Sequence, residues 1–388
     1  MKATMSGFDL RAVARELNDY SGAYVKKAYM PHYEQIVLRI NPKEIDQFDL
    51  VLVRGSRIYT SNRDRPMPMA PPPFAMVLRK HLKNARMTGV HQLGFDRVLC
   101  FDFDTKFGQY NLYVEVFRDG NIILTDEQDT IIQPLTHASY AGRTLKKGVT
   151  YQPPPAAIDP HEMKLETLAE MFENSDRDLV STLGGKVNLG GTHANAVCAL
   201  AGMEANIDTQ DADAEKIHTA LQSLLTDLAE SREGFLLLKP DKENSKEDLE
   251  HQSATHDPNG KRDRFFEQYA CEATPTLLPH HTSLTQIRFP TLCEAVDAWK
   301  GAHDAMALAR REAEKLDIAA PGRGHSTDVE RLERRKVQQE KALQGFSVKI
   351  EKQQMLGHLI QNNWTHVESL LTQVSTAVEV KGWSQVKK

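Results

Sequence analysis

The spacing of apolar residues changes several times along the 388-residue chain. In residues 6–19, Leu10, Val13 and Leu17 recur at the three-to-four-residue spacing of an amphipathic helix. Ser6 and Asp9 stand three positions apart where this pattern starts, as in a capping box, whose side chains satisfy backbone N–H groups of the first turn. The sequence therefore predicts a helix that begins near Ser6.

Segments typical of strands follow this helix. Ile36, Leu38 and Ile40 occupy alternate positions, which indicates a strand with one buried face. Strands are predicted over residues 33–40, 49–53, 57–60, 97–103, 110–117, 121–125 and 130–132, and a helix over residues 74–86. Arg118-Asp119-Gly120-Asn121 predicts a hairpin turn between two of the strands. The first domain is expected to be α+β with mostly antiparallel pairing.

Helical patterns dominate after a linker at residues 148–155, which contains three consecutive prolines. Helices are predicted over residues 165–174, 176–183, 192–201 and 214–231, interrupted by the pairs Gly184-Gly185 and Gly190-Gly191. A short β-rich insertion is expected over residues 234–239 and 265–276.

The last hundred residues carry two apolar seams with heptad-like spacing. One seam comprises Leu292, Val296, Trp299, His303 and Met306, and the other Ile360, Trp364, Val367, Leu371, Val374 and Val378. The turn Pro321-Gly322-Arg323-Gly324 lies between them. This pattern predicts an antiparallel coiled-coil arm, with a helix pair packed flat on a domain as the alternative. The predicted domains are residues 1–155, 156–235, 236–290 and 291–388.

Composition excludes several classes of protein. The chain is 40% hydrophobic and 26% charged, an ordinary globular mixture. No segment approaches the roughly 18 consecutive apolar residues of a membrane-spanning helix, and the chain starts without an apolar secretory core. Four cysteines without a CxxC pair predict neither a disulfide framework nor a cysteine zinc site. We expect a cytoplasmic protein that makes no contact with membranes.

Charge is distributed unevenly. Residues 1–154 carry 21 Lys and Arg against 16 Asp and Glu, a net charge of +5, whereas the remainder carries 27 against 37, a net charge of −10. A basic amino-terminal part indicates contact with an anionic partner, although an ordinary solvated surface explains so small an excess equally well. The predicted helix over residues 74–86 adds Arg79, Lys80, Lys83 and Arg86, which suit a run of phosphates or form a solvated face.

Two further motifs are candidates for binding, and a histidine pair is not. Asp96-Arg97 stands where a strand is predicted to begin, and a carboxylate beside a guanidinium can read base edges or simply form a local ion pair. Gly190-Gly191 precedes a predicted helix, where backbone N–H groups can face a phosphate, although such a turn also joins helices without any ligand. His280-His281 lacks a third metal ligand nearby in sequence, so no metal site is predicted.

These segments, in this order, resemble the NFACT proteins, the family of RqcH and NEMF. The resemblance rests on Met5-Ser6-Gly7-Phe8-Asp9-Leu10, on Phe95-Asp96-Arg97-Val98 and on Glu115-Val116-Phe117-Arg118-Asp119-Gly120-Asn121. It continues through Gly148-Val149-Thr150-Tyr151-Gln152-Pro153-Pro154, Asn188-Leu189-Gly190-Gly191 and Ile360-Gln361-Asn362-Asn363-Trp364. It covers nearly the whole chain.

The resemblance implies a role in ribosome-associated quality control. Members of the family bind the large ribosomal subunit with stalled peptidyl-tRNA and recruit tRNA, alanyl-tRNA in the prokaryotic branch, for template-free tailing of the nascent chain. In the family the ribosome forms the peptide bond, so we expect that this chain is not an enzyme and needs no cofactor. The tRNA-contacting residues of the family correspond to Asp9, Asp96 and Arg97 here, and the coiled-coil arm contacts the ribosome. The implied fold is similar to the amino-terminal fold of formamidopyrimidine-DNA glycosylases, followed by a helix-hairpin-helix domain.

Two other functions remain as alternatives. A DNA glycosylase would use an amino-terminal proline followed by glutamate, whereas this chain begins Met1-Lys2-Ala3. A fibronectin-binding surface adhesin would need a secretory signal and an anchor. Because members of the family continue beyond the coiled coil into further domains, we expect the chain to be a truncated form.

Overall fold

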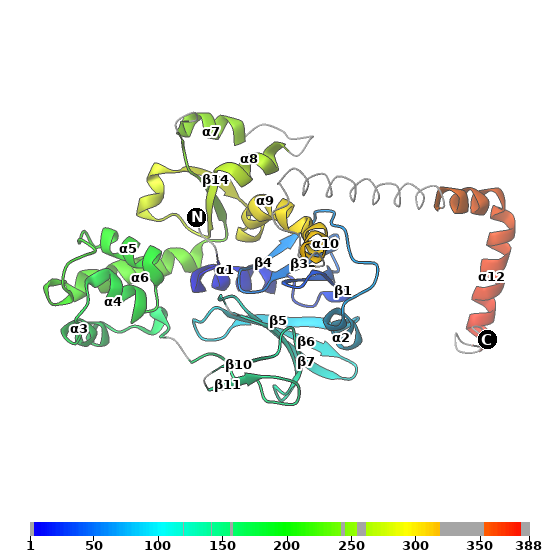
Figure 1. The fold of residues 1–388 in the computed structure, drawn as a ribbon, viewed down its shortest axis with the longest axis horizontal. Coiled ribbons are helices and arrows are strands. Elements are labelled where there is room, and N and C mark those ends of the chain that lie inside the picture. Colours follow the sequence, from blue (N-terminus) through cyan, green and yellow to red (C-terminus); the bar gives the residue numbers. More distant parts are fainter. Residues whose placement is uncertain are drawn as a thin grey trace. The chain divides into compact units, whose positions relative to one another are not determined.

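The computed structural model describes residues 4–118, 120–140, 142–155, 158–241, 245–253, 261–318 and 353–381 (Figure 1). The chain divides into two compact units, Met1–Glu312 and Ala313–Lys388. The first unit holds every strand in the described part of the chain together with helices α1 to α9. The second unit is described over residues 313–318 and 353–381.

A nine-stranded antiparallel sheet forms the centre of the first unit, in the order β4-β3-β2-β1-β5-β6-β7-β8-β9. Its strands are β1 (Tyr24–His32), β2 (Gln35–Asn41), β3 (Phe48–Val53), β4 (Arg57–Ser61), β5 (Arg86–Gln92), β6 (Val98–Thr105), β7 (Gly108–Glu115), β8 (Ile122–Asp126) and β9 (Ile131–Pro134). A two-stranded sheet of β10 (Ala138–Tyr140) and β11 (Arg143–Leu145) follows. The predicted α+β class with mostly antiparallel strands is confirmed.

Helix α1 (Gly7–Asn18) packs against this sheet and buries Leu10, Val13 and Leu17 completely. The predicted capping box is present: Asp9 N donates to Ser6 Oγ over 3.2 Å, and Ser6 N donates to Asp9 Oδ2 over 2.7 Å. The other predicted helix of this region is shorter than expected. Helix α2 (Pro73–Leu82) ends four residues before Arg86, which already belongs to β5.

Four helices and a pair of 3-10 turns make up the next part of the first unit. They are α3 (Leu165–Glu173), α4 (Leu179–Gly185), α5 (Gly190–Leu200) and α6 (Ala214–Glu230), with η1 (Pro160–Glu162) and η2 (Thr209–Asp211). Their shared core also contains Phe8 of α1 and Phe95 of the β5–β6 loop. The carboxyl end of α6 is held by Arg15, whose Nη2 donates to Leu228 O over 2.8 Å and to Ser231 O over 3.1 Å. The helices are therefore joined to the sheet by both apolar packing and hydrogen bonds.

A second sheet, in the order β13-β12-β14, contributes to the core of the nine-stranded sheet. It consists of β12 (Gly234–Leu238), β13 (Ala270–Thr274) and β14 (Thr285–Phe289), and is accompanied by α7 (Lys246–Ser253), α8 (Lys261–Tyr269), η3 (Pro279–Ser283) and α9 (Leu292–Ala305). Residues 265–269, predicted as β-rich, are the end of α8.

Helix α9 corrects one part of the predicted arm. Leu292, Val296 and Trp299 were expected to form a coiled-coil seam, but they lie in the core of the first unit, where α9 packs against β4 and β12. A one-sided apolar stripe looks the same whether it faces a partner helix or a sheet, and here it faces the sheets. Glu16 accepts from the backbone N–H groups of Leu292 and Cys293 at 2.7 and 3.0 Å, which fixes the amino end of α9 on α1.

In the second unit, residues 353–362 are helical and α12 extends over Trp364–Lys381. Along the predicted second seam, Trp364, Leu371 and Val374 are exposed within the described residues. The turn predicted at residues 321–324 lies outside the described residues, so the coiled-coil arm stays a prediction. The helix-hairpin-helix domain and the domain boundaries stay predictions as well.

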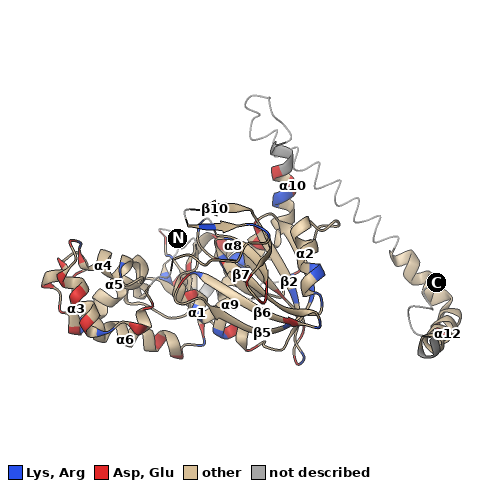
Figure 2. Cartoon of the chain, turned by 90° about the horizontal axis from the view of Figure 1, so that it is seen from below, with Lys and Arg blue, Asp and Glu red and all other residues tan. Residues whose placement is uncertain are grey.

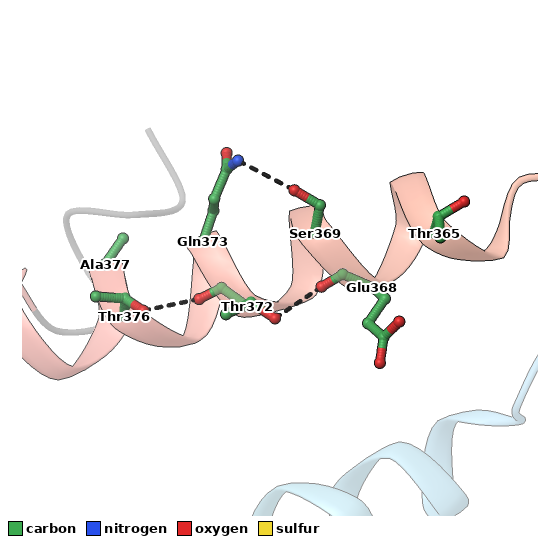
Figure 3. A pocket seen from close by; sticks show the side chains of 7 residues that line it. All are labelled: Thr365, Glu368, Ser369, Thr372, Gln373, Thr376 and Ala377. Atoms are coloured by element: carbon green, nitrogen blue, oxygen red, sulfur yellow. Dashed lines mark hydrogen bonds between the residues drawn. The ribbon is translucent and has the colours of Figure 1, made fainter.

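A hollow on α12 is lined by polar residues of that helix alone (Figure 3). They are Thr365, Glu368, Ser369, Thr372, Gln373 and Thr376, with Ala377. The hydroxyls of Thr372 and Thr376 donate to carbonyl oxygens four positions earlier, over 2.8 and 2.9 Å. Because this hollow brings together no groups from different elements, it is not a candidate site.

Candidate nucleic-acid interface

A cavity of about 380 Å³ opens in the first unit between the start of α1, the β5–β6 loop and the turn that leads into α5. It is lined by residues 4–7, residues 95–97, Gly184 and residues 188–193. Four residues that were predicted from separate motifs meet here, namely Asp96, Arg97, Gly190 and Gly191. We call this cavity the loop–turn pocket.

Asp96 and Arg97 lie in the loop before β6, where the alternation of a strand does not constrain their side chains. Asp96 Oδ1 accepts from the backbone N–H of Arg97 over 2.7 Å, and Asp96 O accepts from Gln92 Nε2 over 2.8 Å. Arg97 is exposed, and its guanidinium forms no ion pair with any residue that the structure describes. The loop therefore offers a fixed carboxylate beside an available cation.

Arg11 holds this loop in place from helix α1. Its guanidinium donates to Gln92 Oε1, to Gly94 O and to Asp159 Oδ2, each over 3.0 Å, and lies 4.9 Å from the centre of the Phe95 ring. Burial opposes ionisation of Asp159, but hydrogen bonds from His161 and Arg11 outweigh it and lower the pKa of the Asp159 carboxyl. Sequence reasoning missed Arg11, because its partners lie some 80 and 150 positions away along the chain.

The glycine turn forms the opposite wall of the loop–turn pocket. Asn188 and Gly190 adopt left-handed backbone conformations, with φ of 63° and 68°. The Asn188 side-chain amide donates to Phe95 O over 3.3 Å and to Ile158 O over 3.2 Å, so it ties this wall to the β5–β6 loop. A Cβ added at Gly190 or Gly191 would meet nothing within 4 Å, because both residues face open space.

An aromatic cluster lies beneath the two walls. The Phe8 ring lies 4.6 Å from the Phe95 ring and 4.2 Å from the His193 ring, measured between centroids. All three side chains are buried. Since Phe8, Phe95 and His193 come from α1, the β5–β6 loop and α5, their packing sets the width of the pocket.

Asp9 does not reach the surface of the loop–turn pocket. It is buried, and its Oδ2 accepts from the Ser6 hydroxyl over 2.8 Å as well as from the Ser6 backbone. Ser6 and Gly7 do line the pocket, so Asp9 supports that wall from behind. Its predicted contact with tRNA stays a prediction.

The four predicted phosphate-binding cations lie elsewhere, and not on one helix face as expected. Arg79 and Lys80 are on α2, Lys83 is the residue that ends α2, and Arg86 begins β5. The backbone turns at Asn84, whose φ is 59° and whose N–H donates to Val25 O, which starts the pairing with β1. Asparagine in this conformation is a common helix end, so the sequence did contain the signal.

The α2 end and the loop–turn pocket are separated by the length of a strand. Arg86 stands at the first position of β5, and the loop with Asp96 and Arg97 follows its last position. Seven residues of strand span about 20 Å. Arg79 is also engaged locally, since its Nε donates to Ala28 O over 2.7 Å. The cations therefore do not line the pocket.

The loop–turn pocket lies where the charge of the chain changes sign. Residues 156–235, which include α3 to α6, carry 15 Asp and Glu against 5 Lys and Arg. Figure 2 shows acidic residues along these helices and basic residues near α2. Among the described residues, no helix is long and apolar enough to span a membrane.

Comparisons with known proteins agree with the resemblance found in the sequence. The archaeal Rqc2 homolog aRqcH of Methanocaldococcus jannaschii is 27% identical over 400 residues, which cover all of this chain and 54% of that protein. The human ribosome quality control complex subunit NEMF is 26% identical over 401 residues, 35% of its length. This chain thus spans about half or less of these two curated relatives.

One solved structure shows the same fold. The amino-terminal part of the fibronectin/fibrinogen-binding protein of Streptococcus suis superposes with a TM-score of 0.55 and 21% identity, covering 77% of this chain and all of that one. The family model described as NFACT N-terminal and middle domains matches residues 6–378 of this chain. The chain therefore belongs to the NFACT family.

Proposed function

We propose that this chain binds tRNA in the loop–turn pocket and acts in ribosome quality control. The observation that carries the proposal is the meeting of Asp96, Arg97, Gly190 and Gly191 in one cavity. Its volume of about 380 Å³ lies near the lower end of the range for small-ligand sites, which suits one unstacked nucleotide. Curated relatives named as ribosome quality control subunits support the biological setting.

Each wall contributes a different contact. Arg97 donates to a guanine edge or stacks on a base, and Asp96 accepts from a base amino group through the oxygen that Arg97 N does not occupy. The open face at Gly190 and Gly191 lets a phosphate approach the backbone at the start of α5. Asp9 acts on the ligand through Ser6, because its own carboxylate is buried. Arg79, Lys80, Lys83 and Arg86 contact phosphates at a separate surface.

The partners follow from the family. The chain binds the large ribosomal subunit with stalled peptidyl-tRNA and recruits tRNA, alanyl-tRNA in the first instance, for template-free addition of residues to the nascent chain. The ribosome forms the peptide bond, so the chain acts in the cytoplasm as a positioning factor and not as an enzyme. Residues 291–388 contact the subunit through those parts that lie outside the first unit's core.

The test is co-sedimentation with purified large ribosomal subunits, followed by sequencing of the small RNAs that copurify. Asp96→Ala combined with Arg97→Ala is expected to abolish enrichment of one tRNA class while leaving subunit binding intact. Glu233→Ala combined with Arg288→Ala is the matched control, because it also removes one acidic and one basic side chain from the surface. Glu233 precedes β12 and Arg288 lies in β14, so both belong to the second sheet and not to the pocket.

Three results would contradict the proposal. Unchanged tRNA enrichment by the Asp96 and Arg97 double variant would remove the pocket from the tRNA site. Failure to bind subunits or tRNA, together with retention on damaged duplex DNA, would favour the glycosylase alternative. Retention on immobilised fibronectin alone would favour the adhesin alternative, for which the S. suis likeness at 21% identity shows only the fold.

A further inference from the structure

A second cluster of chemically reactive side chains lies on strands β5 and β6, apart from the loop–turn pocket. In the register of this antiparallel pair, His91 faces Cys100 and Gly89 faces Asp102. One ligand atom of each of His91, Cys100 and Asp102 lies within 4.8 Å of the other two. Imidazole, thiolate and carboxylate are the three ligand types that bind zinc in proteins.

The Asp102 carboxylate contacts both other side chains of this cluster, each through a different oxygen, at separations close to those between zinc ligands. His91 Nδ1 lies 3.1 Å from Asp102 Oδ2, and Cys100 Sγ lies 3.5 Å from Asp102 Oδ1. Zinc bonds of about 2.0–2.1 Å to nitrogen and oxygen and about 2.3 Å to sulfur place tetrahedral ligands roughly 3.3 and 3.5 Å apart. The Asp102 carboxylate therefore bridges His91 and Cys100, so a small rotation of this side chain would place one oxygen beside both.

The backbone makes room for this arrangement. The register between β5 and β6 shifts between Met87 and Gly89, which is a bulge in β5. A Cβ at Gly89 would lie 3.1 Å from Asp102 Oδ2, closer than a side chain normally allows. The bulge and the glycine together let the Asp102 carboxylate lean across β5 toward His91.

Neighbouring residues hold the cluster from β7 and the loop after β8. Tyr113 faces Cys100 across the β6–β7 pair, and its hydroxyl donates to Asp129 Oδ1 over 2.6 Å. Asn111 Nδ2 donates to the same Asp129 oxygen over 3.1 Å. Asp129 has a φ of 59°, a conformation that non-glycine residues rarely adopt. Such ordered partners behind the ligands are usual at metal sites.

We propose that His91, Cys100 and Asp102 bind a zinc ion, with the fourth position open to water. Cys100 is buried and forms the floor of the site, whereas His91 is exposed and leaves a path for the ion. Zinc binds cysteine as the thiolate, so binding would release the Cys100 proton. The ion would cross-link β5 and β6, the two strands that carry the loop with Asp96 and Arg97.

A second group of potential ligands, Glu272, His280 and His281, serves as the internal control. His281 Nδ1 accepts from the backbone N–H of Leu278 over 3.0 Å, so in the neutral ring the proton is on Nε2. That nitrogen faces Glu272 Oε2 at 3.6 Å and has no lone pair to give to a metal. We expect no zinc at this group.

The experiment titrates zinc, and separately cobalt(II), into the untagged protein after treatment with a chelator. One equivalent is expected to bind, with a thiolate-to-cobalt charge-transfer band in the near ultraviolet. Cys100→Ser should remove this band, and His91→Gln should weaken zinc binding by more than about tenfold. Cys271→Ser and His280→Gln should leave both the affinity and the band unchanged.

Thermal melts make the test independent of the buried cysteine. Because His91 is exposed, His91→Gln should fold as the parent protein does, yet zinc should raise the melting temperature of the parent only. The proposal is overturned if no stoichiometric zinc binds, if His91→Gln binds zinc as the parent does, or if the charge-transfer band depends on Cys271 in place of Cys100.

Discussion

Gly191→Ala separates the stability of the loop–turn pocket from its binding function. Gly191 is the second residue of α5, and an added Cβ would meet nothing within 4 Å. Alanine is preferred over glycine in a helix by up to about 1 kcal/mol, because glycine loses more backbone entropy on folding. The substitution should therefore leave the protein as stable as before, or stabilise it by as much as about 1 kcal/mol.

The same methyl group should weaken RNA binding. It extends into the space where a phosphate would approach the backbone at the start of α5. We expect the affinity for tRNA to fall by about tenfold, which corresponds to about 1.4 kcal/mol. A protein that becomes more stable while it loses affinity cannot owe that loss to unfolding.

Gly190→Ala is the matched comparison. Its surroundings are equally open, but its φ of 68° lies in the left-handed region, where a Cβ costs about 1–2 kcal/mol. This variant should be destabilised as well as weakened in binding. Urea unfolding gives the stability of both variants, and filter binding or fluorescence anisotropy with purified tRNA gives their affinities.

The refuting result is a stable Gly191→Ala protein that binds tRNA with unchanged affinity. Such a protein would show that the ligand stays away from the α5 turn. A loss of stability in Gly191→Ala would contradict the structural premise that its Cβ enters open space.

Three further predictions concern charged groups. Asp304→Ala should destabilise the fold by about 3–5 kcal/mol in urea titrations, because it removes a buried carboxylate and leaves the half-buried Arg57 without its partner at 2.8 Å. Burial opposes the ionisation of Asp304, yet hydrogen bonds from His303, Arg57 and Tyr59 lower its pKa, so this stabilisation is complete above about pH 4 and is lost on further acidification. The hydrogen bond to Asp102 raises the pKa of the His91 imidazole. In metal-free protein this pair therefore stabilises the fold below about pH 6.5 and loses its effect as the pH rises. Urea titrations at pH 5.5 and pH 8.5 should differ by at most about 1 kcal/mol in the free energy of unfolding from this pair. If four to six phosphates are contacted, tRNA affinity should fall with salt at a logarithmic slope of about −3 to −4, and a flat salt dependence would contradict phosphate binding.

Irregular pairing accounts for two long strands that the sequence hides, although the irregular pair β8–β9 was predicted and the regular pair β10–β11 was not. β2 and β3 pair without interruption, so the alternation of Ile36, Leu38 and Ile40 survives in the sequence. β1 and β5 were not predicted, and both contain register shifts, after Val25 and after Met87. A bulge breaks the two-residue period on which the prediction depends. His91 of the proposed zinc site was hidden for the same reason, whereas Cys100 and Asp102 lie in the predicted strand over residues 97–103.

The sequence revealed both motifs of the candidate site, but not that they lie next to each other in the fold. Asp96-Arg97 and Gly190-Gly191 were each identified from local chemistry, and neither motif specifies its neighbour. What joins them is a tertiary contact, the bond from Asn188 Nδ2 to Phe95 O, between residues 93 positions apart. Local patterns do not encode such contacts, whereas the capping box at Ser6 was predictable because both partners lie within one turn.

The charge around the loop–turn pocket indicates what the pocket does for binding. Residues 1–154 are basic by five charges, and residues 156–235 are acidic by ten, so the pocket is not a strongly positive surface. Contacts to phosphates supply most of the affinity of a nucleic-acid-binding protein, whereas contacts to base edges supply its selectivity. An Asp–Arg pair at a boundary of opposite charge is therefore suited to choosing among tRNAs and poorly suited to holding them. Under the proposed function, the affinity for tRNA would come from surfaces outside the pocket, such as the cations at the end of α2. Substitutions there should then weaken the binding of all tRNAs alike, while substitutions in the pocket should change which tRNA is bound.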